Sequence, residues 1–107
     1  MRSIDRDQVR TMIDRADARL VEVLGPEKYD EFHLPGAINV PIGEDFEDRI
    51  QKAVPDKSEP VIVYCHDEDC DASPKAARRM DALGYQRVYD YEAGKVDWKQ
   101  AGLPVEQ

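Results

Sequence analysis

The sequence has few cysteines and no long apolar segment. Only two of its 107 residues are cysteine, which excludes a small domain held together by several disulfides. No apolar stretch approaches the length of a bilayer crossing, so we expect no membrane-spanning segment. The first ten residues, MRSIDRDQVR, lack the apolar core of a signal peptide. These absences favour a cytoplasmic protein with reduced thiols.

Basic residues are also scarce relative to acidic ones. Fifteen Lys and Arg stand against 23 Asp and Glu, which gives a formal net charge of −8. Such a chain repels nucleic-acid backbones and anionic membranes, so we expect neither as a partner. Its length and its 41% hydrophobic content predict one domain, residues 1–107, with a small core. The sequence leaves the oligomeric state open.

Apolar residues recur with helical and strand periods in turn along the chain. The periods and the turn residues predict strands at 20–23, 37–40, 61–64 and 87–91, and helices at 5–16, 26–32, 46–53, 74–83 and 96–102. Strands and helices that alternate at short spacing form a parallel sheet with helices on both faces, so we predict an α/β fold. Ligands bind such sheets just beyond the carboxyl ends of the strands.

Cys65 occupies that position, because it directly follows the most apolar predicted strand, VIVY. The segment HDEDCDA comes next, and Ser73 and Pro74 then have the residue types of a helix N-cap and first helical position. If this loop curls into a cradle, its backbone N–H groups and the helix N-terminus point at the sulfur, stabilise a thiolate and lower the thiol pKa. The alternative is that Cys65 is an ordinary small buried residue.

The second cysteine, Cys70, lies in the same loop. It could act as a resolving thiol that attacks an oxidised or persulfidated Cys65, or it could simply pack beneath the loop. A zinc site built from Cys65, His66 and Cys70 matches no standard ligand spacing, so we expect no metal. His66 could pair with a thiolate or be an exposed loop residue. For His33, in FHLPGA, we favour a structural role over a proton shuttle.

Three separated blocks of the sequence resemble the rhodanese-like domains, a sulfurtransferase family. They are LVEVLGPEKYDEFHLPGAINVP (20–41), VIVYC (61–65) and LGYQRVYDYEAGKVDWKQAGLPVE (83–106). The resemblance implies a five-stranded parallel sheet flanked by helices, with Ser3 and Ile4 adding a short edge strand. It also implies that Cys65 carries a sulfane sulfur as a persulfide and passes it to a thiol or protein acceptor, without any cofactor.

The candidate active-site loop departs from the family pattern. It comprises His66, Asp67, Glu68, Asp69, Asp71, Ala72 and Ser73 around Cys70, and it is longer and more acidic than the short Gly- and Arg-containing loop of active members. Such a loop disfavours anionic donors such as thiosulfate and favours neutral or cationic partners. Phosphatases that share the fold keep Cys-x5-Arg, but the sixth residue after Cys65 is Asp71, so phosphatase activity is not expected. Leu24 also stands where the family often has arginine.

Three functional hypotheses follow from these residues. The first is a sulfurtransferase that uses Cys65 as the persulfide carrier. The second is a non-catalytic module that binds a basic protein surface through the acidic loop. The third is a dithiol redox or sulfur-relay protein in which Cys65 and Cys70 cycle.

Overall fold

The computed structural model describes all residues from 1 to 107. Strands and helices alternate along the chain in the order β1 (Arg2–Ile4), α1 (Arg6–Asp14), β2 (Arg19–Glu22), α2 (Pro26–Glu31), β3 (Ile38–Asn39), α3 (Phe46–Ala53), β4 (Val61–Tyr64), α4 (Ala72–Ala82), β5 (Val88–Tyr91) and α5 (Gly94–Gln100). The strands form one parallel sheet with the order β1-β5-β4-β2-β3. The predicted α/β fold and the short edge strand at Ser3 and Ile4 are therefore confirmed.

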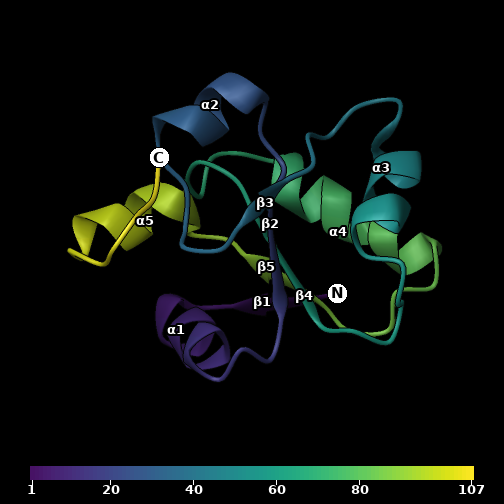
Figure 1. Cartoon of the computed structure of the whole chain (residues 1–107), viewed down its shortest axis with the longest axis horizontal. Helices are drawn as coiled ribbons and strands as arrows, with labels where there is room; N and C mark the ends of the chain where they lie inside the picture. The colour runs from purple at the N-terminus through teal and green to yellow at the C-terminus, as the bar shows by residue number, and fades with distance from the viewer.

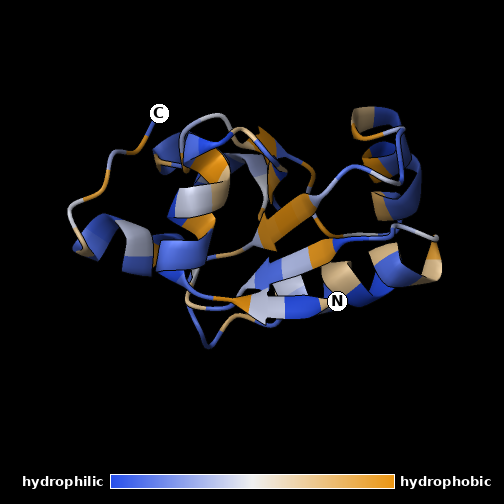
Figure 2. Cartoon of the chain, turned by 90° about the horizontal axis from the view of Figure 1, so that it is seen from below, coloured by the Kyte–Doolittle hydropathy of each residue, from blue (hydrophilic) through white to orange (hydrophobic).

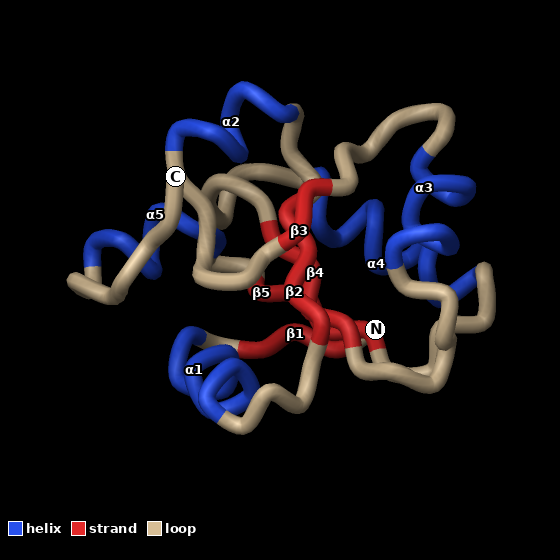
Figure 3. Tube along the Cα trace, in the orientation of Figure 1, coloured by secondary structure: helices blue, strands red, loops and turns tan.

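The sheet lies between two helical layers, as Figures 1 and 3 show. Helices α3 and α4 cover one face, where Phe46 and Met80 belong to a cluster of 14 buried residues. Helices α1 and α5 cover the other face, where Val9 and Trp98 belong to a second cluster of nine. The helices carry both apolar and polar colours in Figure 2, as expected for elements with one buried face. No helix combines the length and apolar character that a membrane crossing requires.

Strand β4 is at the centre of this sheet and is buried along its whole length. Side chains alternate between the two faces, so Val61 and Val63 pack beneath α3 and α4, whereas Ile62 and Tyr64 pack towards α1 and α5. This alternation explains why no polar residue interrupts the strand. It also brings Cys65, the next residue, to the α3 and α4 face.

Several element boundaries differ from those predicted. Ser73 does not cap a helix: α4 begins at Ala72, and Ser73 is a buried residue of its first turn. The last helix begins at Gly94 rather than at 96; this glycine has a φ of +75°, in the left-handed region that glycine adopts readily. The first helix ends at Asp14, before Ala16, whose positive φ of 53° is incompatible with continuing it.

Candidate active site

Cys65 lies at the carboxyl end of the central strand, but its side chain is not open to solvent. The residue is only 1% exposed and belongs to the apolar cluster beneath α3 and α4. Its sulfur lies 3.5 Å from the backbone oxygen of Cys70 and 3.5 Å from the hydroxyl oxygen of Ser73. The loop after Cys65 therefore folds back over the sulfur rather than away from it.

The predicted decrease in the thiol pKa is wrong for the resting structure. Burial and the interaction with Cys70 together raise the pKa of Cys65 to about 11, although the hydroxyl and backbone of Ser73 act in the opposite direction. At neutral pH the resting side chain is a neutral thiol. It can donate its proton to the Cys70 carbonyl, which is an acceptor and gives a thiolate no stabilisation.

The loop amides are engaged within the loop itself. The N–H of Cys70 donates to the backbone oxygen of Asp67 at 3.1 Å, and the N–H of Asp69 donates to the Asp67 carboxylate at 3.1 Å. This Asx turn uses two donors that the sequence suggested for the sulfur. The groups of the loop that do favour a Cys65 thiolate are the hydroxyl and backbone of Ser73 at the start of α4.

The carboxylates of the loop are mostly directed towards solvent. Glu68, Asp69 and Asp71 are exposed, and Ala72 is partly buried where α4 begins. Asp71 forms an ion pair with Lys75 at 2.9 Å, and hydrogen bonding to that lysine lowers the pKa of Asp71. These charges therefore act mainly on molecules that approach from outside, because solvent screens them from the buried sulfur.

The start of α5 fixes the segment that carries Cys65. The N–H of Lys95 donates to the backbone oxygen of Cys65 at 3.0 Å, and the N–H of Val96 donates to that of His66 at 3.0 Å. A Cβ atom at Gly94 would lie 2.5 Å from the His66 oxygen, so only glycine allows this close approach. His66 is half-buried, and its Nδ1 has no hydrogen-bond partner.

A buried ion pair behind the site was missed in the sequence. The Lys95 ammonium lies 3.1 Å from the Glu22 carboxylate, and both side chains are completely buried. The same ammonium donates to the backbone oxygens of Lys28 at 2.6 Å and Phe32 at 2.8 Å. No local sequence pattern indicates this pair, because its two residues are 73 positions apart.

A second buried acid, Asp90, was also missed. Its side chain is fully buried at the end of β5, and neither carboxylate oxygen has a hydrogen-bond partner. Burial raises the pKa of Asp90, and the nearby Ser73 side chain lowers it. An acid in the otherwise apolar strand VYDY was the signal for this residue.

His33 and Trp98 have the contacts of structural residues. The His33 ring stacks on Tyr29 with a centroid distance of 3.8 Å, and its Nδ1 lies 2.9 Å from the Tyr29 backbone oxygen. Its backbone pairs with that of Glu106 in both directions at 2.9 Å. The Trp98 indole donates to the Pro104 oxygen at 2.8 Å. These bonds tie the C-terminal segment to the α1 and α5 side of the sheet.

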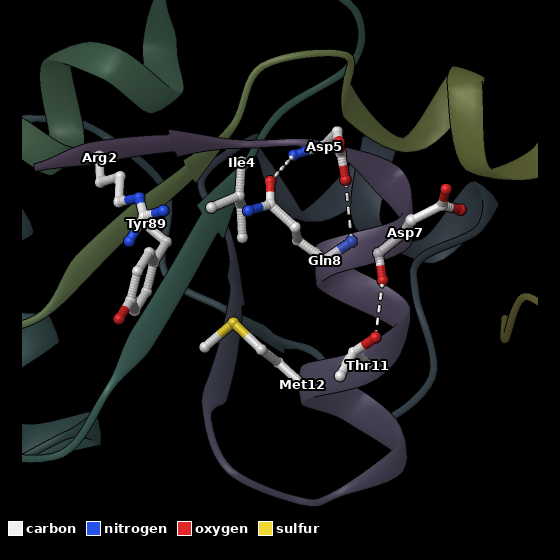
Figure 4. A pocket seen from close by; sticks show the side chains of 8 residues that line it. All are labelled: Arg2, Ile4, Asp5, Asp7, Gln8, Thr11, Met12 and Tyr89. Carbon is white, nitrogen blue, oxygen red and sulfur yellow. Dashed lines mark hydrogen bonds between the residues drawn. The ribbon is translucent and has the colours of Figure 1, made fainter.

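The largest cavity of the protein lies elsewhere. It has a volume of about 490 Å³ and lies between α1 and the edge of the sheet formed by β1 and β5. Figure 4 shows that Asp5 and Gln8 in its wall bond each other as the capping box of α1, both at 2.9 Å. Because these polar groups satisfy one another, we assign no chemistry to this cavity. No three His, Cys, Asp or Glu side chains converge to hold a metal ion.

Comparison with known proteins assigns the chain to a family. Residues 5–101 match the family model described as the Rhodanese-like domain. The chain is 32% identical over 105 residues to the HTH-type transcriptional regulator Rv0324 of Mycobacterium tuberculosis, covering 98% of this chain and 45% of the relative. It is 40% identical over 68 residues to the thiosulfate sulfurtransferase PspE of Escherichia coli, covering 64% of this chain and 62% of the relative. The chain thus spans less than two thirds of each relative's length.

Solved structures give the same result at the level of the fold. The chain superposes on a thiosulfate sulfurtransferase from Pseudomonas aeruginosa with a TM-score of 0.86 and 26% identity, covering 100% of this chain and 20% of that one. It superposes on the BH2092 protein of Bacillus halodurans with a TM-score of 0.84 and 29% identity, covering 98% of this chain and 76% of that one.

Proposed function

This chain belongs to the rhodanese-like family, and from that premise we propose that it is a sulfurtransferase that carries a sulfane sulfur as a persulfide on Cys65. The observation that carries the proposal is the position of this thiol, at the carboxyl end of the central parallel strand and beneath the loop that leads into α4. That is where ligands meet sheets of this type. Both cysteines are free, which suits a reducing compartment such as the cytoplasm.

The chemistry is a displacement at sulfur. The Cys65 proton passes to solvent, and the resulting thiolate attacks the outer sulfur of the donor. A new S–S bond forms on Cys65, the donor's bond to that sulfur breaks, and the leaving group departs with the electron pair. An acceptor thiolate then attacks the outer sulfur and releases Cys65 as a thiolate.

The raised pKa of Cys65 determines how this step depends on pH. Only the thiolate reacts, and a thiol with a pKa of about 11 is almost fully protonated at neutral pH. The rate of sulfur loading should therefore rise about tenfold per pH unit across the neutral range. The acidic loop adds a preference against dianionic donors, since Glu68 and Asp69 are exposed acids of the loop that follows Cys65.

Intact mass spectrometry tests this function directly. Wild type, Cys65→Ser and Cys70→Ser are each incubated with thiosulfate or with an alkyl persulfide, which carries less negative charge. We expect an adduct of about 32 Da, one sulfur atom, that requires Cys65 and forms faster from the alkyl persulfide. An equal or faster rate from thiosulfate would contradict the proposed effect of the acidic loop.

A dithiol relay is the second candidate, because the Cys70 oxygen touches the Cys65 sulfur and the two side chains interact. The same experiment separates it from sulfur transfer. A loss of two hydrogens that requires both cysteines would favour the relay. No mass change in any of the three proteins would overturn both and favour a non-catalytic binding module.

A further inference from the structure

A second, smaller cavity adjoins the cysteine site. Its volume is about 200 Å³, and it is lined by Glu68, Cys70, Ser73, Pro74, Asp90 and Glu92. Three structural elements form its walls: the acidic loop, the first turn of α4 and the end of β5. Ser73 connects it to the reactive sulfur, since its hydroxyl oxygen lies 3.5 Å from the Cys65 Sγ.

Asp90 makes this cavity unusual. Asp90 is one of the residues that line the cavity, its side chain is fully buried, and neither carboxylate oxygen has a hydrogen-bond partner. A buried carboxylate without a partner is costly, so the group needs either a proton or a cation. Among the charged groups near it, Glu92 raises its pKa and Arg78, which is exposed and outside the cavity wall, lowers it.

The remaining lining residues add negative charge and no positive charge. Glu68 and Glu92 form no ion pair, and the only side-chain bond to Glu92 comes from the Ser3 hydroxyl at 2.6 Å. No lysine, arginine or histidine lines the cavity. Three acidic residues, Glu68, Asp90 and Glu92, thus line a space that is large enough for several water molecules or a small organic group. The arrangement is complementary to a compact organic cation.

We propose that this cavity binds the ammonium group of a small aminothiol, which acts as the sulfur acceptor. The assignment rests on the proposed function, and it specifies the substrate class for the second half of the reaction. Bound through its ammonium to Asp90, the acceptor places its sulfur near Ser73 and the persulfide on Cys65. The acceptor thiolate attacks the outer sulfur, the S–S bond to Cys65 breaks, and Cys65 leaves as a thiolate that regains a proton from solvent.

A pair of unreactive thioethers tests the binding site without any sulfur chemistry. 2-(Methylthio)ethylamine carries the ammonium, and 2-(methylthio)ethanol is its neutral counterpart. In an NMR titration of wild type at pH 7, we expect amide shifts around Ser73 and Glu92 with the amine and at least tenfold weaker binding of the alcohol. Asp90→Asn should abolish this preference and Glu92→Gln should reduce it, whereas the exposed Asp14→Asn, the matched control for net charge, should leave it unchanged.

Single-turnover transfer from preformed persulfide provides the second readout. Cysteamine should accept sulfur faster than 2-mercaptoethanol after correction for thiolate concentration, and Asp90→Asn should reduce that ratio about tenfold. Equal binding of the two thioethers, or an unchanged preference in a folded Asp90→Asn protein, would overturn the cation site. A different outcome is that the protein prefers the amine over the alcohol but forms no persulfide on Cys65. That outcome would refute the proposed function, and the acceptor role with it, but not the cation site.

Discussion

Replacing Lys95 with methionine is the sharpest test of how this fold holds its cysteine segment. The Lys95 side chain is completely buried and pairs with an equally buried Glu22 across 73 residues of sequence. Its ammonium also bonds the oxygens of Lys28 and Phe32 and lies 4.6 Å from the centre of the Phe32 ring. Methionine has a similar length but no charge and no donor, so it leaves all these partners in place and unsatisfied.

The expected loss of stability is large. At the observed 3.1 Å separation, and with an effective dielectric constant of about 20, the attraction between the two charges is about 5 kcal/mol. Removing the lysine also removes the free-energy cost of burying its charge. The measured loss of stability should therefore be smaller than the sum of the charge attraction and the two hydrogen bonds. Breaking a buried ion pair on one side typically costs about 3–5 kcal/mol. That is much of the 5–15 kcal/mol or so that stabilises a domain of this kind.

The free energy of unfolding from urea titration measures this loss. Lys99→Met is the matched control: Lys99 is exposed, and its ammonium lies 4.5 Å from the same Phe32 ring, so we expect a loss below about 1 kcal/mol. Adding Glu22→Gln to the Lys95→Met variant should recover part of the stability, because the uncompensated carboxylate is then gone.

The pH dependence gives an independent check. Burial raises the pKa of Glu22 in the folded protein, and Lys95 is the main influence that lowers it. A carboxyl group with a raised folded pKa favours folding at low pH and loses that contribution as the pH rises through this value. The deficit of Lys95→Met should therefore shrink between pH 8 and pH 4.5. A loss below about 1 kcal/mol, or one that does not depend on pH, would refute the ion-pair reasoning.

Three further predictions follow from the site. Gly94→Ala should lower the free energy of unfolding by more than about 2 kcal/mol, because the new Cβ atom would clash with the backbone at His66. Gly102 has a similar φ of +77° but open space around it, so Gly102→Ala should cost about 1 kcal/mol. Equal losses for the two variants in urea titration would contradict the backbone clash. Iodoacetamide at pH 7.5 should modify Cys70 at least about tenfold faster than Cys65, because Cys65 is buried and burial raises its pKa. Peptide mass mapping measures the two rates, and faster modification of Cys65 would contradict its burial. Burial also raises the pKa of Asp90, so the wild type loses stability as the pH rises through that value. Asp90→Asn should therefore be more stable than the wild type at pH 8 but not at pH 4. An equal gain in stability at both pH values would show that the carboxyl group is not the cause.

Much of the fold follows from local patterns in the sequence. VIVY predicts a strand buried on both faces, and β4 is such a strand. The helix predicted at 5–16 begins with Asp5 and Gln8, which have the residue types of a capping box, and both hydrogen bonds of that motif are present at the start of α1. Patterns of this kind can be recognised in a sequence because periodic burial and helix capping depend on residues a few positions apart.

The candidate site was predicted less completely. The position of Cys65 directly after the most apolar strand follows from the sequence, but the central place of that strand and the burial of the thiol do not. A shift of the helix start from the position after Ser73 to Ala72 converts that serine from a cap into an inward-facing residue that contacts the sulfur. Each residue added to a helix turns the next side chain by about 100°, so a small boundary error reverses what a side chain faces.

The sequence by itself determined that the chain forms a parallel α/β domain, that a cysteine follows its most apolar strand, and that the adjoining loop is acidic. Only the tertiary structure decided that the loop closes over a protonated thiol, that Lys95 neutralises Glu22, and that Asp90 has an unpartnered carboxyl group beside Ser73. The physical reason is that the periodic patterns that define helices and strands, and the residue types themselves, are local properties. Burial and charge pairing instead arise between residues that packing brings together from distant parts of the chain.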